Sequence, residues 1–239
     1  MRRLSWDLPL APPKWSSVAA ALRTMLHAGD GELFLVGLLR RTSPRGEQPE
    51  QRDERREVIV EELGEYKPDI FCINEICIPR QTGRYFQHAA KDSHGLEYNL
   101  VQQAKTGSQS VVDGEGILTG FPIRETANFD YRARDSVAQV ARVEIEGRLV
   151  DVYVTHLYSS VGNDSFRLYQ VEQLLDWIGS RDDVDAKMVC GDFNATLDMA
   201  SAALMATRFT PSQTEHTAFT PLQERDGVPS HPDLSLIHI

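Results

Sequence analysis

The sequence predicts an α/β protein of the α+β kind, in which a mixed sheet is covered by helices. Two observations support this fold class. Apolar runs typical of buried strands are interspersed with segments whose apolar residues keep helical period. In addition, Glu146 and Gly147 separate two strand-like runs, which indicates a hairpin and therefore antiparallel neighbours. Since a strictly parallel sheet has no hairpins, a mixed sheet fits better.

The N-terminal third begins with a segment of weak structural preference. Residues 1–30 contain three prolines and only a weak helical patch over 18–26, so we interpret them as an N-terminal extension. The apolar run 32–41 is the first strand candidate. A charged loop then leads into a helix whose apolar face includes Ile59, and Pro68 ends this helix.

Buried strands and one further helix account for the following elements. Their apolar runs are bounded by turn residues or end in polar side chains, and the helix keeps apolar residues at helical spacing before a glycine. The predicted elements are a strand in 68–76, a strand in 116–123, two strands in 136–157, a helix in 165–178 and a strand in 186–194.

Length, charge and cysteine content narrow the class of protein. The 239 residues suit one large domain or two small ones, and the composition is that of a soluble globular chain. A net charge of −10 argues against a general nucleic-acid binder but leaves room for a local basic groove. Three cysteines are too few for a disulfide framework, which indicates a cytoplasmic protein, or a secreted one if the true start lies upstream. We expect no transmembrane segment, because no run of about 18 apolar residues is present, and we expect a monomer.

Polar side chains follow three of the predicted strands at the point where each strand ends. Glu75 ends the first, His156 ends the second, and Asp192 with Asn194 follows the third. If these strands are neighbours, their ends converge on one pocket. Carboxylates bind hard cations, and imidazole and amide groups can contact a phosphate, so this set fits metal-assisted attack of water on a phosphate ester. Taken singly, each residue also has a structural interpretation, since Asp-x-Asn is typical of an Asx turn.

These motifs resemble those of a known family. The segments PDIFCINEI, GILTGFPI, VYVTHL, FRLYQVEQLLDWI and VCGDFNAT occur in the order seen in the endonuclease/exonuclease/phosphatase superfamily, over roughly residues 32–233. This deoxyribonuclease I-like fold is a four-layer sandwich, with two mixed β-sheets packed face to face and helices outside. The resemblance implies Mg²⁺-dependent, or possible Mn²⁺-dependent, hydrolysis of a phosphodiester or phosphomonoester in a nucleic acid, phospholipid or small molecule.

The resemblance also implies a role for each site residue. Glu75 is the expected metal ligand, and His156 is expected to contact the scissile phosphate. Asp192 would orient or deprotonate the attacking water, and Asn194 would stabilise the transition state. Three further residues are expected to support the site: Asn74, where many relatives have glutamine, and Arg167 and Gln170 of the predicted helix.

Two departures from the family bear on activity. Gly37 stands where we expect the asparagine that helps to hold the metal. The C-terminal Ser-Asp-His motif is missing, and the last six residues, 234–239, match the translation of a sequencing-library adapter. We therefore expect a phosphoesterase domain over 31–233 that is incomplete at its C-terminus, so that the chain as given is nearly inactive.

Two alternatives remain open. The chain could be a non-catalytic, phosphate-binding member of the same fold, for which Gly37 and the missing motif are the evidence. A zinc site built from the pairs Cys72 and Cys77, and His88 and His94, only loosely imitates finger spacing. In an extended strand the five-residue separation of the two cysteines puts their thiols on opposite faces.

Overall fold

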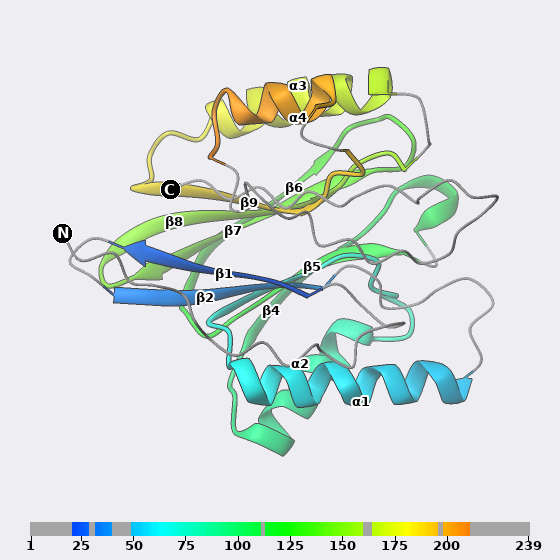
Figure 1. The fold of residues 1–239 in the computed structure, drawn as a ribbon, viewed down its shortest axis with the longest axis vertical. Helices are drawn as coiled ribbons and strands as arrows, with labels where there is room; N and C mark the ends of the chain where they lie inside the picture. Colours follow the sequence, from blue (N-terminus) through cyan, green and yellow to red (C-terminus); the bar gives the residue numbers. More distant parts are fainter. Residues whose placement is uncertain are drawn as a thin grey trace.

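The computed structural model describes residues 21–28, 32–39, 49–110, 113–159, 164–195 and 198–210. They form four layers, with two sheets face to face in the middle and a pair of helices outside each (Figure 1). The predicted fold class, a sandwich of two mixed sheets with helices outside, is therefore confirmed.

The first sheet has the strand order β1-β2-β3-β5-β4. Only β2 and β3 are parallel, and the other neighbours are antiparallel, so the sheet is mixed. The strands are β1 (Ala21–Ala28), β2 (Glu32–Leu39), β3 (Ile70–Ile73), β4 (Asn99–Ala104) and β5 (Gly114–Thr119).

The second sheet has the order β6-β7-β8-β9, with only β8 and β9 parallel. Its strands are β6 (Ile123–Asp130), β7 (Val137–Ile145), β8 (Arg148–His156) and β9 (Ala186–Asp192). The predicted hairpin between β7 and β8 is confirmed. Glu146 and Gly147 both have positive φ, 50° and 79°, as a tight hairpin turn between twisted strands requires.

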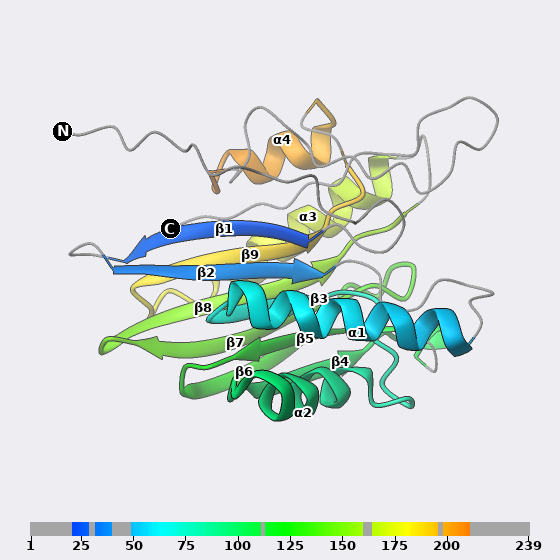
Figure 2. The same ribbon diagram turned by 60° about the horizontal axis from the view of Figure 1, so that its bottom comes forward.

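Helices cover the outer face of each sheet. On the first sheet lie α1 (Pro49–Tyr66) and α2 (Thr82–His94), which Figure 2 shows in front of β3, β4 and β5. On the second sheet lie α3 (Asp164–Gly179) and α4 (Ala200–Ala206). The loop after β4 contains a 3₁₀ turn, η1 (Gly107–Gln109).

The space between the sheets is filled by small and β-branched side chains. Val152 and Val154 of β8 meet Ile117 of β5 there, and the thiols of Cys72 and Cys190 lie together in the same cluster. This placement explains the cysteines as core residues. No zinc-binding group that contains Cys72, Cys77, His88 or His94 is found among the described residues.

One expectation from the N-terminal region is wrong. Residues 21–28 form strand β1 at the edge of the first sheet, where we expected a weak helical patch over 18–26. Pairing with β2 outweighs a weak local preference. In the register with β3, Gly37 lies beside Phe71. The expectation that Gly37 stands in place of a metal-ligating asparagine stays a prediction.

The C-terminal expectations are outside the described part of the chain. Residues 211–239 include both the predicted domain end at 233 and the predicted adapter segment, so both stay predictions. Within the described ranges, no helix is long and apolar enough to span a membrane.

Candidate active site

The parallel strands β8 and β9 end side by side and bring two predicted site residues together. His156 and Asp192 are the last paired residues of the two strands. His156 Nε2 lies 3.4 Å from Asp192 Oδ2, and both side chains are buried. The prediction that these strand ends converge is therefore confirmed for this pair.

The Gly-Asp-Phe-Asn sequence has a steric reason for its glycine. Gly191 adopts φ 148°, and a Cβ there would lie 1.9 Å from the carbonyl oxygen of Thr155. Only glycine lets β9 approach β8 this closely. Beyond it, Asp192 Oδ1 accepts a hydrogen bond from the backbone N–H of Asn194, and Asn194 Nδ2 donates to the carbonyl of Leu157 at 2.9 Å. The Asx turn and the site are thus the same structure.

The first sheet contributes Asn74 and Glu115 to the same place. Asn74 Nδ2 donates to a carboxylate oxygen of Glu115 and, at 3.0 Å, to the carbonyl of Thr155 on β8. Both side chains are fully buried. Asn74 therefore joins the two sheets directly behind His156, as a supporting residue.

Lys105 extends from the end of β4 into this cluster. Its ammonium lies 2.7 Å from Asp113 Oδ2 and 2.9 Å from His156 Nδ1. Because an ammonium only donates hydrogen bonds, Nδ1 of His156 must be the acceptor. The neutral imidazole then carries its hydrogen on Nε2, which faces Asp192.

The charges in the cluster influence one another strongly. Burial lowers the pKa of Lys105, but the carboxylates of Glu115, Asp113 and Glu75 outweigh this effect and the net pKa is raised. Burial raises the pKa of Glu115 well above its usual value, although the Lys105 charge opposes the shift. Lys105 is therefore a retained positive charge next to the histidine.

Glu75, the predicted metal ligand, lies directly after β3. It is half-buried and has a left-handed backbone with φ 56°. Its charge raises the pKa of both Lys105 and Glu115, so it faces the same cluster. The one group of three possible metal ligands among the described residues is different, comprising Asp113, Glu115 and His156 with ligand atoms within 4.8 Å of one another.

The donor set suits a hard cation, but not in the middle of that group of three. Lys105 already contacts Asp113 and His156 and would repel a divalent ion there. Two buried oxygens, Asn74 Oδ1 and Glu115 Oε1, have no hydrogen-bond partner among the described residues. Such oxygens are the ligand atoms that Mg²⁺ and Mn²⁺ prefer. The residues present therefore fit a metal on the Glu75 side of the cluster.

The helix residues Arg167 and Gln170 lie behind the site rather than in it. Gln170 Oε1 accepts from the backbone N–H of Tyr158, and Arg167 donates to the carbonyl of Tyr158 at 3.2 Å. Both side chains hold the segment that leaves β8, and their supporting role in catalysis stays a prediction.

Three residues of the cluster escaped the sequence analysis: Lys105, Asp113 and Glu115. Only Glu115 has a sequence signal, because it is a charged residue within the apolar run of β5. Every residue of β5, including Glu115, is buried. Lys105 and Asp113 carry no comparable signal, since both belong to a polar loop region.

Comparison with known proteins finds one curated relative and several solved structures of similar fold. No family model matches the chain. Nocturnin from Xenopus laevis is 28% identical over 161 residues, which is 60% of this chain and 40% of that protein. The human Nocturnin catalytic domain with bound sulfate matches with TM-score 0.53 at 25% identity, covering 65% of this chain and 62% of that one.

A bacterial structure extends the fold match. The mannosyl-6-phosphatase Bt3783 of Bacteroides thetaiotaomicron matches with TM-score 0.57 at 13% identity, covering 78% of this chain and 77% of that one. The chain thus spans less than half of the Xenopus protein and about three fifths of the human catalytic domain.

Proposed function

We propose that this chain, which belongs to the endonuclease/exonuclease/phosphatase superfamily, comes from a divalent-metal-dependent phosphoesterase. One neighbour in the fold, the mannosyl-6-phosphatase Bt3783, is by its name an enzyme that acts on a phosphoester. The observation that carries the proposal is the convergence of His156, Asp192 and Lys105 at the ends of β8, β9 and β4. A sulfate is bound in the human Nocturnin structure, which supports an oxyanion site in this fold.

The chain's own residues supply distinct parts of an in-line attack by water. Asp192 has an oxygen toward His156 and can orient or deprotonate the water. His156, with hydrogen on Nε2, can donate to a phosphoryl oxygen. The Asn194 amide uses one hydrogen on the Leu157 carbonyl, and its other hydrogen would stabilise the transition state. Lys105 adds a fixed positive charge for the phosphate.

Mg²⁺ or Mn²⁺ would be held by Glu75, with the free oxygens of Asn74 and Glu115 nearby. A bound divalent cation supplies charge neutralisation at the phosphoryl oxygens and a water of lowered pKa. The non-catalytic alternative keeps the same residues for binding a phosphate without turnover.

The test is hydrolysis of bis(4-nitrophenyl) phosphate with Mg²⁺, comparing the parent with D192N and H156A. We expect each substitution to lower turnover by roughly 10³-fold, because each removes a group that acts on the transition state. D182N is the matched control, since Asp182 is an exposed carboxylate on the loop before β9. Full activity in D192N would contradict the mechanism.

The assay should use two chains. One is the 239-residue chain, which we expect to be nearly inactive. The other is the protein encoded by the gene after its 3′ end has been sequenced from independently prepared DNA. Phosphate binding without turnover in both chains would favour the non-catalytic alternative.

A further inference from the structure

A cation and two aromatic rings form a cluster on the rim of the candidate site. The Arg134 guanidinium carbon lies 4.3 Å from the ring centroid of Phe166 and 5.1 Å from that of Tyr158. The two rings meet edge to face, with centroids 5.4 Å apart. We refer to Arg134, Tyr158 and Phe166 as the rim cluster.

The rim cluster begins where the candidate site ends. Tyr158 is two residues beyond His156, and the carbonyl of the intervening Leu157 accepts the amide of Asn194. A group bound on the rim cluster would therefore be a near neighbour of a phosphate held by His156.

Buried side chains of α3 fix the backbone that carries the cluster. Gln170, which is fully buried, accepts from the N–H of Tyr158 at 2.9 Å and donates to the carbonyl of Ala133 at 3.1 Å. One side chain thus holds the segments of both Tyr158 and Arg134, while Phe166 lies one turn earlier on the same helix. The three groups are consequently preorganised.

The loop of Arg134 is also held from the first sheet's side. Arg134 and Asp135 both have left-handed backbones, with φ 57° and 59°. The carbonyl of Asp135 accepts from the N–H of Thr106, and its carboxylate accepts from Ser108 at 3.2 Å. These contacts keep Arg134 over the rings.

The rim cluster differs from the other aromatic group of the same sheet in having no fully buried ring and in carrying an exposed cation. The other group consists of Phe129, Tyr131, Tyr153 and Trp177; its two tyrosines are fully buried under α3, and its other two rings are partly buried against them. In the rim cluster, Arg134 is exposed and both rings are half-buried. Packing accounts for the first group and leaves the rim cluster available to a ligand.

We propose that the rim cluster binds the planar base of a nucleotide whose phosphate lies at His156 and Lys105. This inference rests on the proposed function and names its substrate class. The exposed Arg134 guanidinium, which lies over both rings, can contact the flat face of a nucleobase through stacking and cation–π attraction. Sugar phosphates have no planar group to use it, and neither do the headgroups of common phospholipids.

Calorimetric titration of the full chain in EDTA tests the proposal without turnover. The probes are adenosine 5′-monophosphate and ribose 5-phosphate, which differ by the base. We expect the nucleotide to bind the parent ~10-fold more tightly, as one stacked base contributes. R134N and F166L should each lower nucleotide affinity to that of the sugar phosphate, while leaving the sugar phosphate unchanged. Asparagine is used because it tolerates the left-handed backbone.

R132N is the matched control, since Arg132 is an exposed arginine of the same loop with φ 52° and should keep the ~10-fold preference. Equal affinity of the parent for the two probes would overturn the proposal. It would also be overturned if F166L lost the same affinity for both probes, because such a loss indicates that Phe166 has a structural role. If the protein hydrolyses bis(4-nitrophenyl) phosphate but binds the two probes equally, this inference is wrong and the proposed function stands. If it binds the nucleotide more tightly than the sugar phosphate but hydrolyses nothing, the proposed function is wrong and this inference stands.

Discussion

Two buried carboxylates on the two sheets are satisfied to very different degrees. Asp151 on β8 and Glu115 on β5 are both fully buried. Asp151 accepts hydrogen bonds on both oxygens, from Arg142 at 2.7 and 3.1 Å and from Arg181 at 3.1 Å, with Tyr153 adding a fourth. Glu115 has one amide donor on one oxygen and none, among the described residues, on the other.

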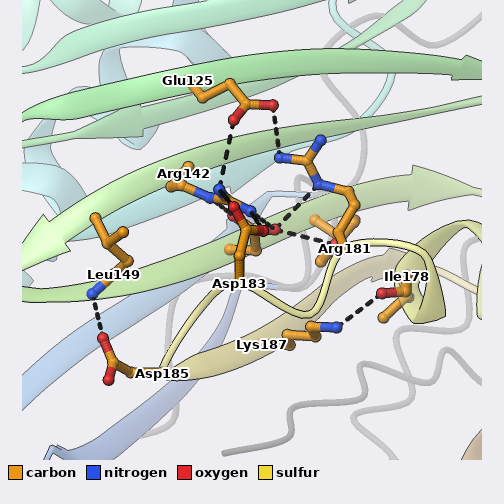
Figure 3. A network of polar contacts seen from close by, with 10 residues as sticks. Glu125, Arg142, Leu149, Ile178, Arg181, Asp183, Asp185 and Lys187 are labelled. Carbon is orange, nitrogen blue, oxygen red and sulfur yellow. Dashed lines mark hydrogen bonds and ion pairs between the residues drawn. The ribbon is translucent and has the colours of Figure 1, made fainter.

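The surroundings of the two carboxylates differ in the same way. Figure 3 shows Arg142 and Arg181 between Asp183 and Glu125. Both arginines also form ion pairs with Asp151, so that cations and anions alternate. We call this the arginine network; it lies ~17 Å before the end of β8. The group at that end, which we call the Glu115 cluster, consists of Glu75, Lys105, Asp113, Glu115 and His156. It contains one ammonium among three carboxylic groups.

The difference separates a structural network from a functional one. Complete hydrogen bonding lets the arginine network fix the loop between α3 and β9 against the second sheet. Unsatisfied buried oxygens cost stability unless a ligand uses them. The incomplete cluster is therefore the one placed to bind something, and the following predictions test this contrast.

The largest expected effect is on stability, in the arginine network. D151A leaves two guanidinium groups without their shared carboxylate, and we expect a loss of about 3–5 kcal/mol in the free energy of unfolding. Urea unfolding monitored by circular dichroism measures it. D183N is the control, because Asp183 is 77% exposed and should change stability far less. A D151A protein as stable as its parent would show that the network is not structural.

The next effect is on activity, in the Glu115 cluster. K105M removes the cation next to His156, and we expect turnover to fall roughly 100-fold in a form of the protein that hydrolyses the substrate. K105R should recover little, because a planar guanidinium does not fit the position of a compact ammonium. The measurement is the steady-state rate with bis(4-nitrophenyl) phosphate. If D151N, which changes the other buried carboxylate, lowered turnover as much, the contrast between the networks would fail.

The sequence predicted the parts of this molecule that have local signals. Apolar runs identified β3, β8 and β9, and the residue types at their ends identified His156 and Asp192. Edge strands were harder, because β6 has only exposed and half-buried residues and presents no apolar run. β1 was missed because its identity depends on pairing with β2 rather than on its own composition.

The missed part of the site has the same cause. Lys105 reaches His156 across 51 residues of sequence, and Asn74 reaches Thr155 across 81. No spacing rule within one segment reports a contact between two sheets. Arg142 and Asp151, on adjacent antiparallel strands, are paired by register alone.

The third prediction concerns pH in metal-free buffer. The pKa of Glu115 is raised in the folded state, so its contribution to stability is full below its unfolded pKa and is lost as pH rises through the folded pKa. We therefore expect the parent to lose stability from acidic toward neutral pH, and E115Q to lose less. The measurement is the urea concentration at the unfolding midpoint, taken at several pH values between 4 and 8. The quantity compared is the difference in this midpoint between E115Q and the parent at each pH. A constant difference across that range would contradict the raised pKa.

The smallest expected effect is the opposite pH response of the arginine network. Hydrogen bonds from Arg142 hold the pKa of Asp183 below its ordinary value of 3.8. Its contribution to stability is present above that ordinary value and is lost as pH falls through the lower, folded pKa. D183N should therefore flatten the acid side of the stability curve, whereas E115Q flattens the side toward neutral pH. Because Asp183 is exposed, added salt should shrink its effect and leave that of buried Glu115 in place. If both substitutions flattened the same side of the curve, the two networks would not differ in the way their hydrogen bonding implies.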